Sequence, residues 1–158
     1  MNPLERAEIR KTGVQLTRLG LGGSPLSGTQ LGGYQYGGTS YHEALQIIRR
    51  AYELGIRYFD TAPSYGEGRS EVRFGAALAS WPRRSYIIST KVGKALYPAG
   101  DGSVVQPEGL PKMTVGYDVS RDGILRSLDE SLRLLKRDAV DVLLVHEPER
   151  PGQYDWWD

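Results

Sequence analysis

Apolar residues along this chain occur either as short continuous runs or at helical spacing, and the two patterns alternate. Continuous runs typical of buried strands lie at 19–22, 56–60, 86–90 and 140–145. Between them, apolar residues recur at helical spacing over about 40–55, 70–79 and 120–137. The pattern predicts four strands separated by three helices, an α/β fold with a parallel sheet and right-handed crossovers. Alternating apolar residues at 8–17 predict a hairpin before the first strand.

Local signals support these elements. Ser40 is followed three residues later by Glu43, the arrangement of a capping box, and Gly55 follows the helix that Ser40 begins. The helix that begins after Ser120 has apolar residues at one spacing: Ile124, Leu128, Leu132 and Leu135. The last strand, VDVLLV at 140–145, is almost continuously apolar, as expected for a strand buried on both faces.

Two ways of closing such a sheet are open. A doubly wound sheet that binds a nucleotide usually carries G-x-G-x-x-G after its first strand, but here Pro25 stands at the third glycine position. A (β/α)8 TIM barrel fits the repeat better, although such barrels take about 250 residues and eight strands. We therefore expect residues 1–158 to form a single partial (β/α)8 barrel domain. It would be the N-terminal half, a β-hairpin and then four parallel strands with three crossover helices.

Two glycine-rich segments interrupt the repeat. Residues 28–38 hold five glycines, and we expect a surface loop there, although glycine also permits close approach of the backbone to a ligand. Residues 92–119 lose all periodicity and contain several prolines and glycines. A structureless run of this length is uncommon in a folded domain unless it covers a site or is disordered. We expect it to cover the strand ends as a lid.

Composition excludes several kinds of partner. Twenty basic and 19 acidic side chains give a net charge of +1, and they are interleaved, so no basic face for nucleic acid or anionic lipid is predicted. Without cysteine there are no disulfides or sulfur-ligated metals, and the two histidines are far apart, so no metal site is expected. No apolar run approaches the roughly 20 residues of a membrane helix. We expect a cytoplasmic protein that binds neither nucleic acid nor membrane.

Polar residues that could carry chemistry follow the predicted strands. Asp60, Lys91 and His146 each stand at the carboxyl end of a strand, and Tyr65 lies in the loop after the first of these. Each alone has a structural explanation, such as capping a turn, contact with solvent or packing. Because the carboxyl ends of barrel strands converge on one face, where active sites lie, the four together predict a catalytic site.

The four side chains also suit one reaction. A tyrosine is a weak acid, and a neighbouring ammonium such as that of Lys91 stabilises its phenolate. Asp60 could hold this lysine by an ion pair. His146, as a neutral imidazole, could orient a carbonyl oxygen. Together they suit proton transfer to an alkoxide as a hydride reaches the carbonyl carbon.

The motifs that carry these residues resemble the aldo-keto reductase family: LGLGGSPL, GIRYFDTAPSYGEGRSE, IISTKVG and RSLDESLRLLKRDAVDVLLVHEPE. The resemblance implies a (β/α)8 barrel, NAD or NADP as cofactor, and a catalytic tetrad at Asp60, Tyr65, Lys91 and His146. It implies cofactor binding by Gly23, Ser24 and Asp60 near the nicotinamide, with the adenosine phosphates held mostly by loops and a helix start after the later strands. TKVGKAL and the long segment after it look most like sugar (aldose, fucose or galactose) dehydrogenases, hence a small carbonyl or sugar substrate.

Two other hypotheses about the function are consistent with the same motifs. In one, the chain is a non-catalytic half-barrel fragment that does not bind cofactor alone and self-associates, since a half-barrel leaves a strand edge open. In the other, a barrel glycosidase uses Asp60 with Glu67, Glu71 and Glu147 as its carboxylates. This second alternative leaves Lys91 and Tyr65 without a role, so the oxidoreductase reading is preferred.

Overall fold

The computed structural model describes residues 2–28, 38–100 and 102–148 of the chain. Within them, a four-stranded parallel sheet has the order β10-β5-β4-β3. Its strands are β3 (Leu21–Gly22), β4 (Tyr58–Asp60), β5 (Ile87–Val92) and β10 (Val142–Val145). The predicted order of four parallel strands is therefore confirmed. The third strand differs from the prediction, because β5 continues through Lys91 to Val92 instead of stopping before the lysine.

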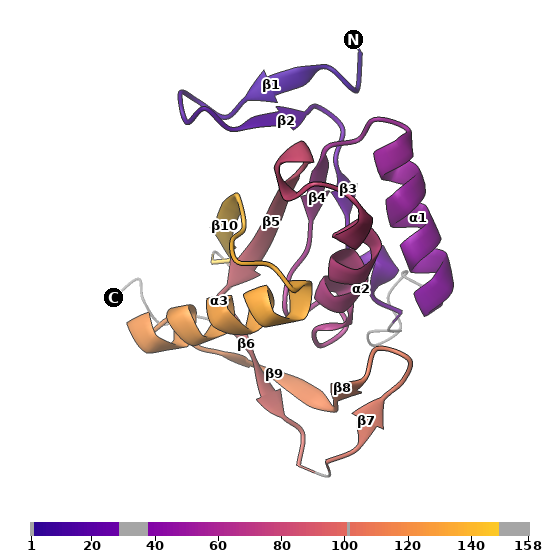
Figure 1. Cartoon of the computed structure of the whole chain (residues 1–158). Helices are drawn as coiled ribbons and strands as arrows, with labels where there is room; N and C mark the ends of the chain where they lie inside the picture. The colour runs from indigo at the N-terminus through magenta and orange to yellow at the C-terminus, as the bar shows by residue number, and fades with distance from the viewer. Residues whose placement is uncertain (1, 29–37, 101, 149–158) are drawn as a thin grey trace.

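Three helices connect these strands and lie side by side along one face of the sheet (Figure 1): α1 (Tyr41–Glu53), α2 (Arg69–Ala77) and α3 (Arg121–Leu135). The capping box of α1 is present in both directions, between Ser40 and Glu43, and Gly55 follows the helix at a φ of 99°. Short 3-10 turns complete the connections at η1 (Pro25–Ser27), η2 (Leu78–Ser80) and η3 (Arg83–Ser85). The architecture is thus that of a partial α/β barrel.

The core fills the space between the sheet and the helices. Its largest fully buried apolar side chains come from both layers: Phe59, Ile88 and Tyr86 from the sheet side, and Ile48, Phe74 and Leu135 from the helices. Phe59 meets Phe74 and Tyr86 edge to face, with ring centroids 6.0 and 6.1 Å apart. Full burial of such side chains contributes about 2 kcal/mol each, which makes this layer the main source of stability.

Helix α3 buries a different stripe from the predicted one. Its fully buried residues are Gly123, Ser127, Ser131, Leu134 and Leu135. Ile124, Leu128 and Leu132 are only half-buried. Small residues at 123, 127 and 131 let the helix approach its neighbours closely, and this leaves the larger apolar side chains toward its flank.

The predicted hairpin at the amino end is confirmed, whereas the prediction that residues 92–119 lack regular structure is wrong. Strands β1 (Arg6–Glu8) and β2 (Gln15–Thr17) pair antiparallel at one end of the sheet (Figure 1). The segment predicted to be structureless instead forms two antiparallel pairs, at the opposite end. They are β6 (Lys94–Pro98) with β9 (Met113–Tyr117), and β7 (Val104–Val105) with β8 (Leu110–Pro111). Strand β6 packs against α3, so this segment extends the molecule beyond the carboxyl ends of the strands.

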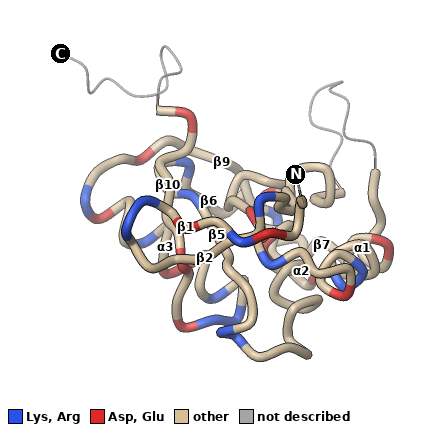
Figure 2. The backbone as a smooth tube through the Cα atoms, turned by 90° about the horizontal axis from the view of Figure 1, so that it is seen from above, with Lys and Arg blue, Asp and Glu red and all other residues tan. Residues whose placement is uncertain are grey.

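Charged residues are distributed over the elements instead of being gathered on one of them (Figure 2). In the part of the chain that the structure describes, no helix is both long and apolar enough to cross a bilayer. Most of the glycine-rich segment at 28–38, for which a surface loop was predicted, lies outside the described residues.

Candidate active site

The four residues predicted to be catalytic come together at the carboxyl edge of the parallel sheet. Asp60 is the last residue of β4, Lys91 is the second last residue of β5, and His146 directly follows β10. The ladder pairs Asp60 with Ser89, and the backbone N–H of His146 donates to the carbonyl oxygen of Val92 at 2.9 Å. The parallel register alone therefore brings residues up to 86 positions apart in the sequence to one edge.

Asp60 and Lys91 form a direct ion pair on the face of the sheet opposite the helices. Lys91 Nζ lies 2.7 Å from Asp60 Oδ2 and 3.0 Å from the carbonyl oxygen of Thr61. The other carboxylate oxygen, Oδ1, accepts a hydrogen bond of 2.6 Å from the hydroxyl of Ser89. The Lys91 side chain is only 12% exposed, so its ammonium is held in place by these acceptors with little water around it.

Tyr65 and His146 complete the cluster. Lys91 Nζ stands 4.7 Å from the centroid of the Tyr65 ring, and the Tyr65 ring meets the His146 ring edge to face with centroids 5.5 Å apart. The hydroxyl of Ser64 lies 3.3 Å from His146 Nδ1. The contacts run without a gap from Asp60 through Lys91 and Tyr65 to His146.

The environment of His146 favours a neutral imidazole. Burial lowers its pKa from 6.5 to about 4, because the charged form loses its water. The ammonium groups of Lys94 and then Lys91 act in the same direction, while Glu147 and Asp60 oppose them. At neutral pH this side chain therefore carries one proton and can donate one hydrogen bond.

Two neighbouring glycines, Gly22 at the end of β3 and Gly23 directly after it, have different surroundings. A Cβ at Gly23 would lie 2.4 Å from Ser70 Oγ and 2.7 Å from the Phe74 ring, so close packing against α2 explains this glycine. At Gly22, which pairs with Asp60 in the ladder, no atom of the described residues other than its chain neighbours lies within 4 Å of the Cβ position. Open space beside the Asp60 carboxylate is therefore found at Gly22, a residue that the sequence analysis did not select.

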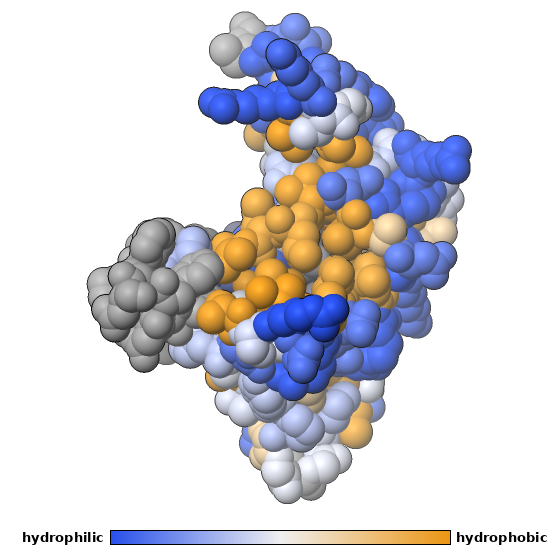
Figure 3. Space-filling model, turned by 90° about the vertical axis from the view of Figure 1, so that its left-hand side faces the viewer, coloured by the Kyte–Doolittle hydropathy of each residue, from blue (hydrophilic) through white to orange (hydrophobic). Residues whose placement is uncertain are grey.

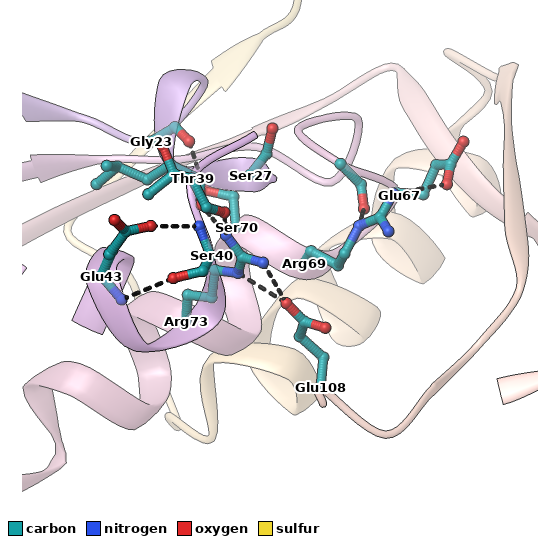
Figure 4. A network of polar contacts seen from close by, with 12 residues as sticks. Gly23, Ser27, Thr39, Ser40, Glu43, Glu67, Arg69, Ser70, Arg73 and Glu108 are labelled. Atoms are coloured by element: carbon teal, nitrogen blue, oxygen red, sulfur yellow. Dashed lines mark hydrogen bonds and ion pairs between the residues drawn. The ribbon is translucent and has the colours of Figure 1, made fainter. Parts of the chain in front are cut away.

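Arg73 connects the loops near the carboxyl edge of the parallel sheet by hydrogen bonds and an ion pair (Figure 4). Its guanidinium group donates to the carbonyl oxygens of Leu26 and Thr39 at 2.6 and 2.9 Å, and pairs with Glu108 at 2.6 Å. The side chains of Arg73 and Glu108 are 5% and 1% exposed. This buried pair joins α2 to both ends of the segment that follows β3 and to the β7–β8 pair.

The carboxylates of the glycosidase reading do not share the site. Glu71 is fully buried and accepts a hydrogen bond of 2.7 Å from Thr90, whose side chain points away from that of Lys91. Burial raises the pKa of Glu71 to about 7. Glu67 pairs with Arg69 at 3.4 Å. Of the three, only Glu147 lies beside the tetrad, and it pairs with Lys94 at 2.5 Å.

The sequence did not predict roles for Ser64 and Ser89, and it indicated Glu147 only as a glycosidase carboxylate, without its partner Lys94. Both serines had a local signal: Ser64 precedes Tyr65, and Ser89 stands two positions before Lys91, on the same face of a strand. The described residues contain no group of three or more His, Asp and Glu side chains that could hold a metal ion.

Comparison with known proteins finds a family model and several relatives that match this chain. The family model of the aldo/keto reductase family matches residues 18–155. A D-threo-aldose 1-dehydrogenase of Pseudomonas is 38% identical over 117 residues, which are 68% of this chain and 35% of that protein. A pyridoxal 4-dehydrogenase of Microbacterium luteolum is 36% identical over 163 residues, covering 96% of this chain and 45% of that protein.

Among solved structures, the holo form of aldo-keto reductase AKR11C1 from Bacillus halodurans superposes with a TM-score of 0.69 at 29% identity. The match covers 90% of this chain and 40% of that one. The chain thus spans less than half the length of the relatives it matches.

Proposed function

Because this chain belongs to the aldo/keto reductase family of oxidoreductases, we propose that it carries the catalytic half of an NAD(P)-dependent site that interconverts a carbonyl compound and an alcohol. The observation that carries the proposal is the unbroken group of Asp60, Lys91, Tyr65 and His146 at the carboxyl edge of the sheet. Its relation to an aldose dehydrogenase supports an aldehyde, ketone or aldose sugar as substrate.

Tyr65 is the general acid of the reduction and the general base of the oxidation. In reduction its hydroxyl donates a proton to the carbonyl oxygen, and the phenolate that forms is stabilised by the Lys91 ammonium beside the ring. Asp60 and the carbonyl oxygen of Thr61 hold that ammonium in place, and Ser89 holds Asp60. The charge that develops on Tyr65 therefore meets a fixed partner, which requires little reorganisation.

His146 orients the carbonyl oxygen. The Ser64 hydroxyl lies 3.3 Å from Nδ1. The proposed role requires the tautomer in which Nδ1 accepts this hydrogen bond and Nε2 carries the proton that would be donated to the substrate. The lowered pKa keeps the ring neutral at physiological pH, so it does not compete with Tyr65 as the proton donor.

The residues near Asp60 fit the nicotinamide end of NAD or NADP. The open Cβ position of Gly22 leaves room beside the Asp60 carboxylate, and Gly23 and Ser24 follow directly at the same edge. When bound, the cofactor supplies or accepts the hydride at the carbonyl carbon. Gly22, Gly23, Ser24 and Asp60 would hold its nicotinamide end.

Oxidation of NADPH or NADH by the purified chain, with a hydroxy aldehyde as substrate, tests the proposal. We expect turnover that Tyr65→Phe abolishes, whereas the control Tyr41→Phe, whose ring packs beside His42 and the Arg73 guanidinium, keeps the parent rate. Intrinsic tryptophan fluorescence would report cofactor binding separately. A chain that neither quenches with cofactor nor turns over would refute the activity, and an unchanged rate in Tyr65→Phe would refute the role of Tyr65.

We also propose that the chain pairs with a second copy through β10. The prediction that this strand is buried on both faces is wrong: within the described residues it is an edge of the sheet, and Leu143, Leu144 and Val145 are 40%, 41% and 38% exposed. Figure 3, seen from this side, shows a broad hydrophobic area. Exposed apolar edge strands favour association. Size-exclusion chromatography with light scattering should give a dimer that Leu144→Lys dissociates, and a monomer for the parent chain would contradict this.

A further inference from the structure

We propose that Glu71 is a positioning residue of the candidate active site, and that the proton on its carboxyl group determines how Tyr65 lies against Lys91. Glu71 belongs to α2 and lies on the helix side of the sheet, whereas the Lys91 side chain extends from the other face. The inference rests on the proposed function, because it concerns side chains assigned to that reaction. It adds a residue that contacts neither substrate nor cofactor and acts through its neighbours.

Glu71 links the two elements that carry Tyr65 and Lys91. Its Oε1 atom accepts a hydrogen bond of 2.7 Å from the hydroxyl of Thr90, which directly precedes Lys91 on β5. Glu71 itself directly follows Ser70, whose backbone N–H donates to the carbonyl oxygen of Tyr65 at 3.1 Å. One side-chain hydrogen bond therefore joins the chain beside the Tyr65 loop to the chain beside Lys91.

The first turn of α2 is also connected to Lys91 through Thr61. The hydroxyl groups of Ser70 and Thr61 lie 2.8 Å apart, and both side chains are fully buried. The carbonyl oxygen of Thr61 accepts a hydrogen bond of 3.0 Å from Lys91 Nζ. The Tyr65 loop, the start of α2 and the Lys91 ammonium thus form one hydrogen-bonded unit, so a shift of α2 changes the contact between Tyr65 and Lys91.

Close packing against α3 prevents the Glu71 side chain from turning away. Gly68 and Gly75 lie three residues before and four residues after Glu71, on the same face of the helix. A Cβ at Gly68 would lie 2.9 Å from the Leu134 side chain. A Cβ at Gly75 would lie 2.5 Å from the carbonyl oxygen of Leu135. Helix α3 therefore covers this face of α2, and Glu71 is fully buried.

The second carboxyl oxygen lacks the hydrogen bonds that a charge needs. Glu71 Oε2 is buried and has no hydrogen-bond partner within the described part of the chain. The same is true of the Ser131 hydroxyl on α3, although this hydroxyl lowers the pKa of Glu71. A neutral carboxyl group is tolerated in such a place, whereas a buried carboxylate with an unpartnered oxygen is strongly disfavoured.

Loss of the proton is therefore expected to displace α2. Burial raises the pKa of Glu71 to about 7 against the hydroxyls of Thr90 and Ser131, while Glu130 of α3 raises it further and Lys91 of β5 opposes the rise. Below about pH 7 the neutral carboxyl group joins α2 to β5 through Thr90. Above this pH the carboxylate requires water, so α2 shifts relative to β5 and carries the Tyr65 loop with it.

NMR of the His146 ring reports this shift without cofactor or substrate. The Tyr65 ring meets the His146 ring edge to face with centroids 5.5 Å apart, so displacement of Tyr65 changes the ring-current shifts of the His146 protons. In a His42→Gln background, His146 is the single histidine of the chain. We expect two steps in a pH titration of its ring protons, one at about pH 4 from its own protonation and one near pH 7 that follows Glu71. The ring nitrogen shifts distinguish the two, because only protonation of the imidazole changes them strongly.

Three variants in this background separate position from charge. Glu71→Gln still accepts a hydrogen bond from Thr90 and does not ionise, so it should keep the low-pH signals of the parent and lose the step near pH 7. Glu71→Ala removes the link between α2 and β5, so the His146 signals should be displaced at every pH. The matched control Glu53→Gln changes an exposed carboxylate on α1 and should keep the step.

A step near pH 7 that persists in Glu71→Gln would overturn the proposal. So would parent signals that do not change near pH 7, or parent-like signals in Glu71→Ala. The comparison with Glu71→Gln remains decisive if Glu71→Ala does not fold. Loss of the step in Glu71→Gln, in a chain without turnover, would support the positioning role and refute the proposed activity. Turnover in a chain that lacks the step would refute the positioning role alone.

Discussion

Replacing Glu71 with glutamine is expected to stabilise this protein more as the pH rises. The Glu71 carboxyl group is fully buried between α2 and β5, where it accepts a hydrogen bond from Thr90. Burial raises its pKa from 4.5 to about 7, against the opposing effects of the Thr90 and Ser131 hydroxyls. Glu130 adds to the rise and Lys91 reduces it.

The sign follows from which state ionises first. Below about pH 4.5 the carboxyl is neutral in both the folded and the unfolded chain. Between 4.5 and about 7 the unfolded chain loses the proton while the folded chain keeps it, so the free energy of unfolding falls as the pH rises. Each unit of pKa difference between the folded and unfolded chain corresponds to about 1.4 kcal/mol, so the free energy of unfolding falls by about 3 kcal/mol in total. Glutamine has the same shape and does not titrate.

Urea unfolding at a series of pH values measures this effect. Trp81 stacks on Tyr52, with ring centroids 4.1 Å apart, and provides a fluorescence signal for the packed state. The difference in unfolding free energy between Glu71→Gln and the parent should grow by about 2.5 kcal/mol from pH 5 to pH 8. His146 has a lowered pKa and titrates with the opposite sign in both chains, so it cancels in the difference. A difference that does not change with pH would refute the reasoning.

Other substitutions test the packing and the charges around the site. Gly23→Ala should lower the unfolding free energy in urea melts by about 1–3 kcal/mol, because its Cβ would overlap Ser70. Gly22→Ala should keep the parent stability and weaken the quenching of fluorescence by cofactor. Equal losses of stability in the two variants would contradict this contrast. Arg73→Met should lower the unfolding free energy by roughly 3 kcal/mol or more, because it leaves the Glu108 carboxylate buried and unpaired. The double variant with Glu108→Leu should recover much of this loss. If the effects of the two substitutions simply add, the two residues are not coupled. In an NMR titration, His146 should stay neutral until the pH falls to about 4, and a midpoint near 6.5 would contradict the lowered pKa.

Much of the site could be predicted because its positions follow from strand order. Asp60, Lys91 and His146 end parallel strands, and the geometry of a parallel sheet brings such ends together whatever the side-chain details. What could not be predicted were the groups that hold them. Ser64 contacts His146 across 82 residues, and Arg73 contacts Glu108 across 35. Such pairs depend on loop paths that no local pattern encodes.

The long segment after Lys91 shows the same limit. Its prolines and glycines remove any helical or alternating pattern, so it was predicted to be structureless. The ladder that pairs Lys94 with Tyr117 is nonlocal, and its strands are stabilised by contact with each other and with α3. Helix α3 shows the limit again. The sequence predicts that this helix is amphipathic, but the close packing of its neighbours determines that the small residues Gly123, Ser127 and Ser131 are buried.

By itself the sequence determined the order of the amino-terminal hairpin, the four parallel strands and the three helices, the capped helix after Ser40, the family resemblance and the four residues expected at the strand ends. These depend on interactions between near neighbours or on a rule of topology. Only the tertiary structure decided that Glu71 is buried against Thr90 of β5, that Gly22 leaves the open space beside Asp60, and that Glu147 pairs with Lys94. Each of these depends on side chains from different elements meeting at distances that chain order alone does not specify.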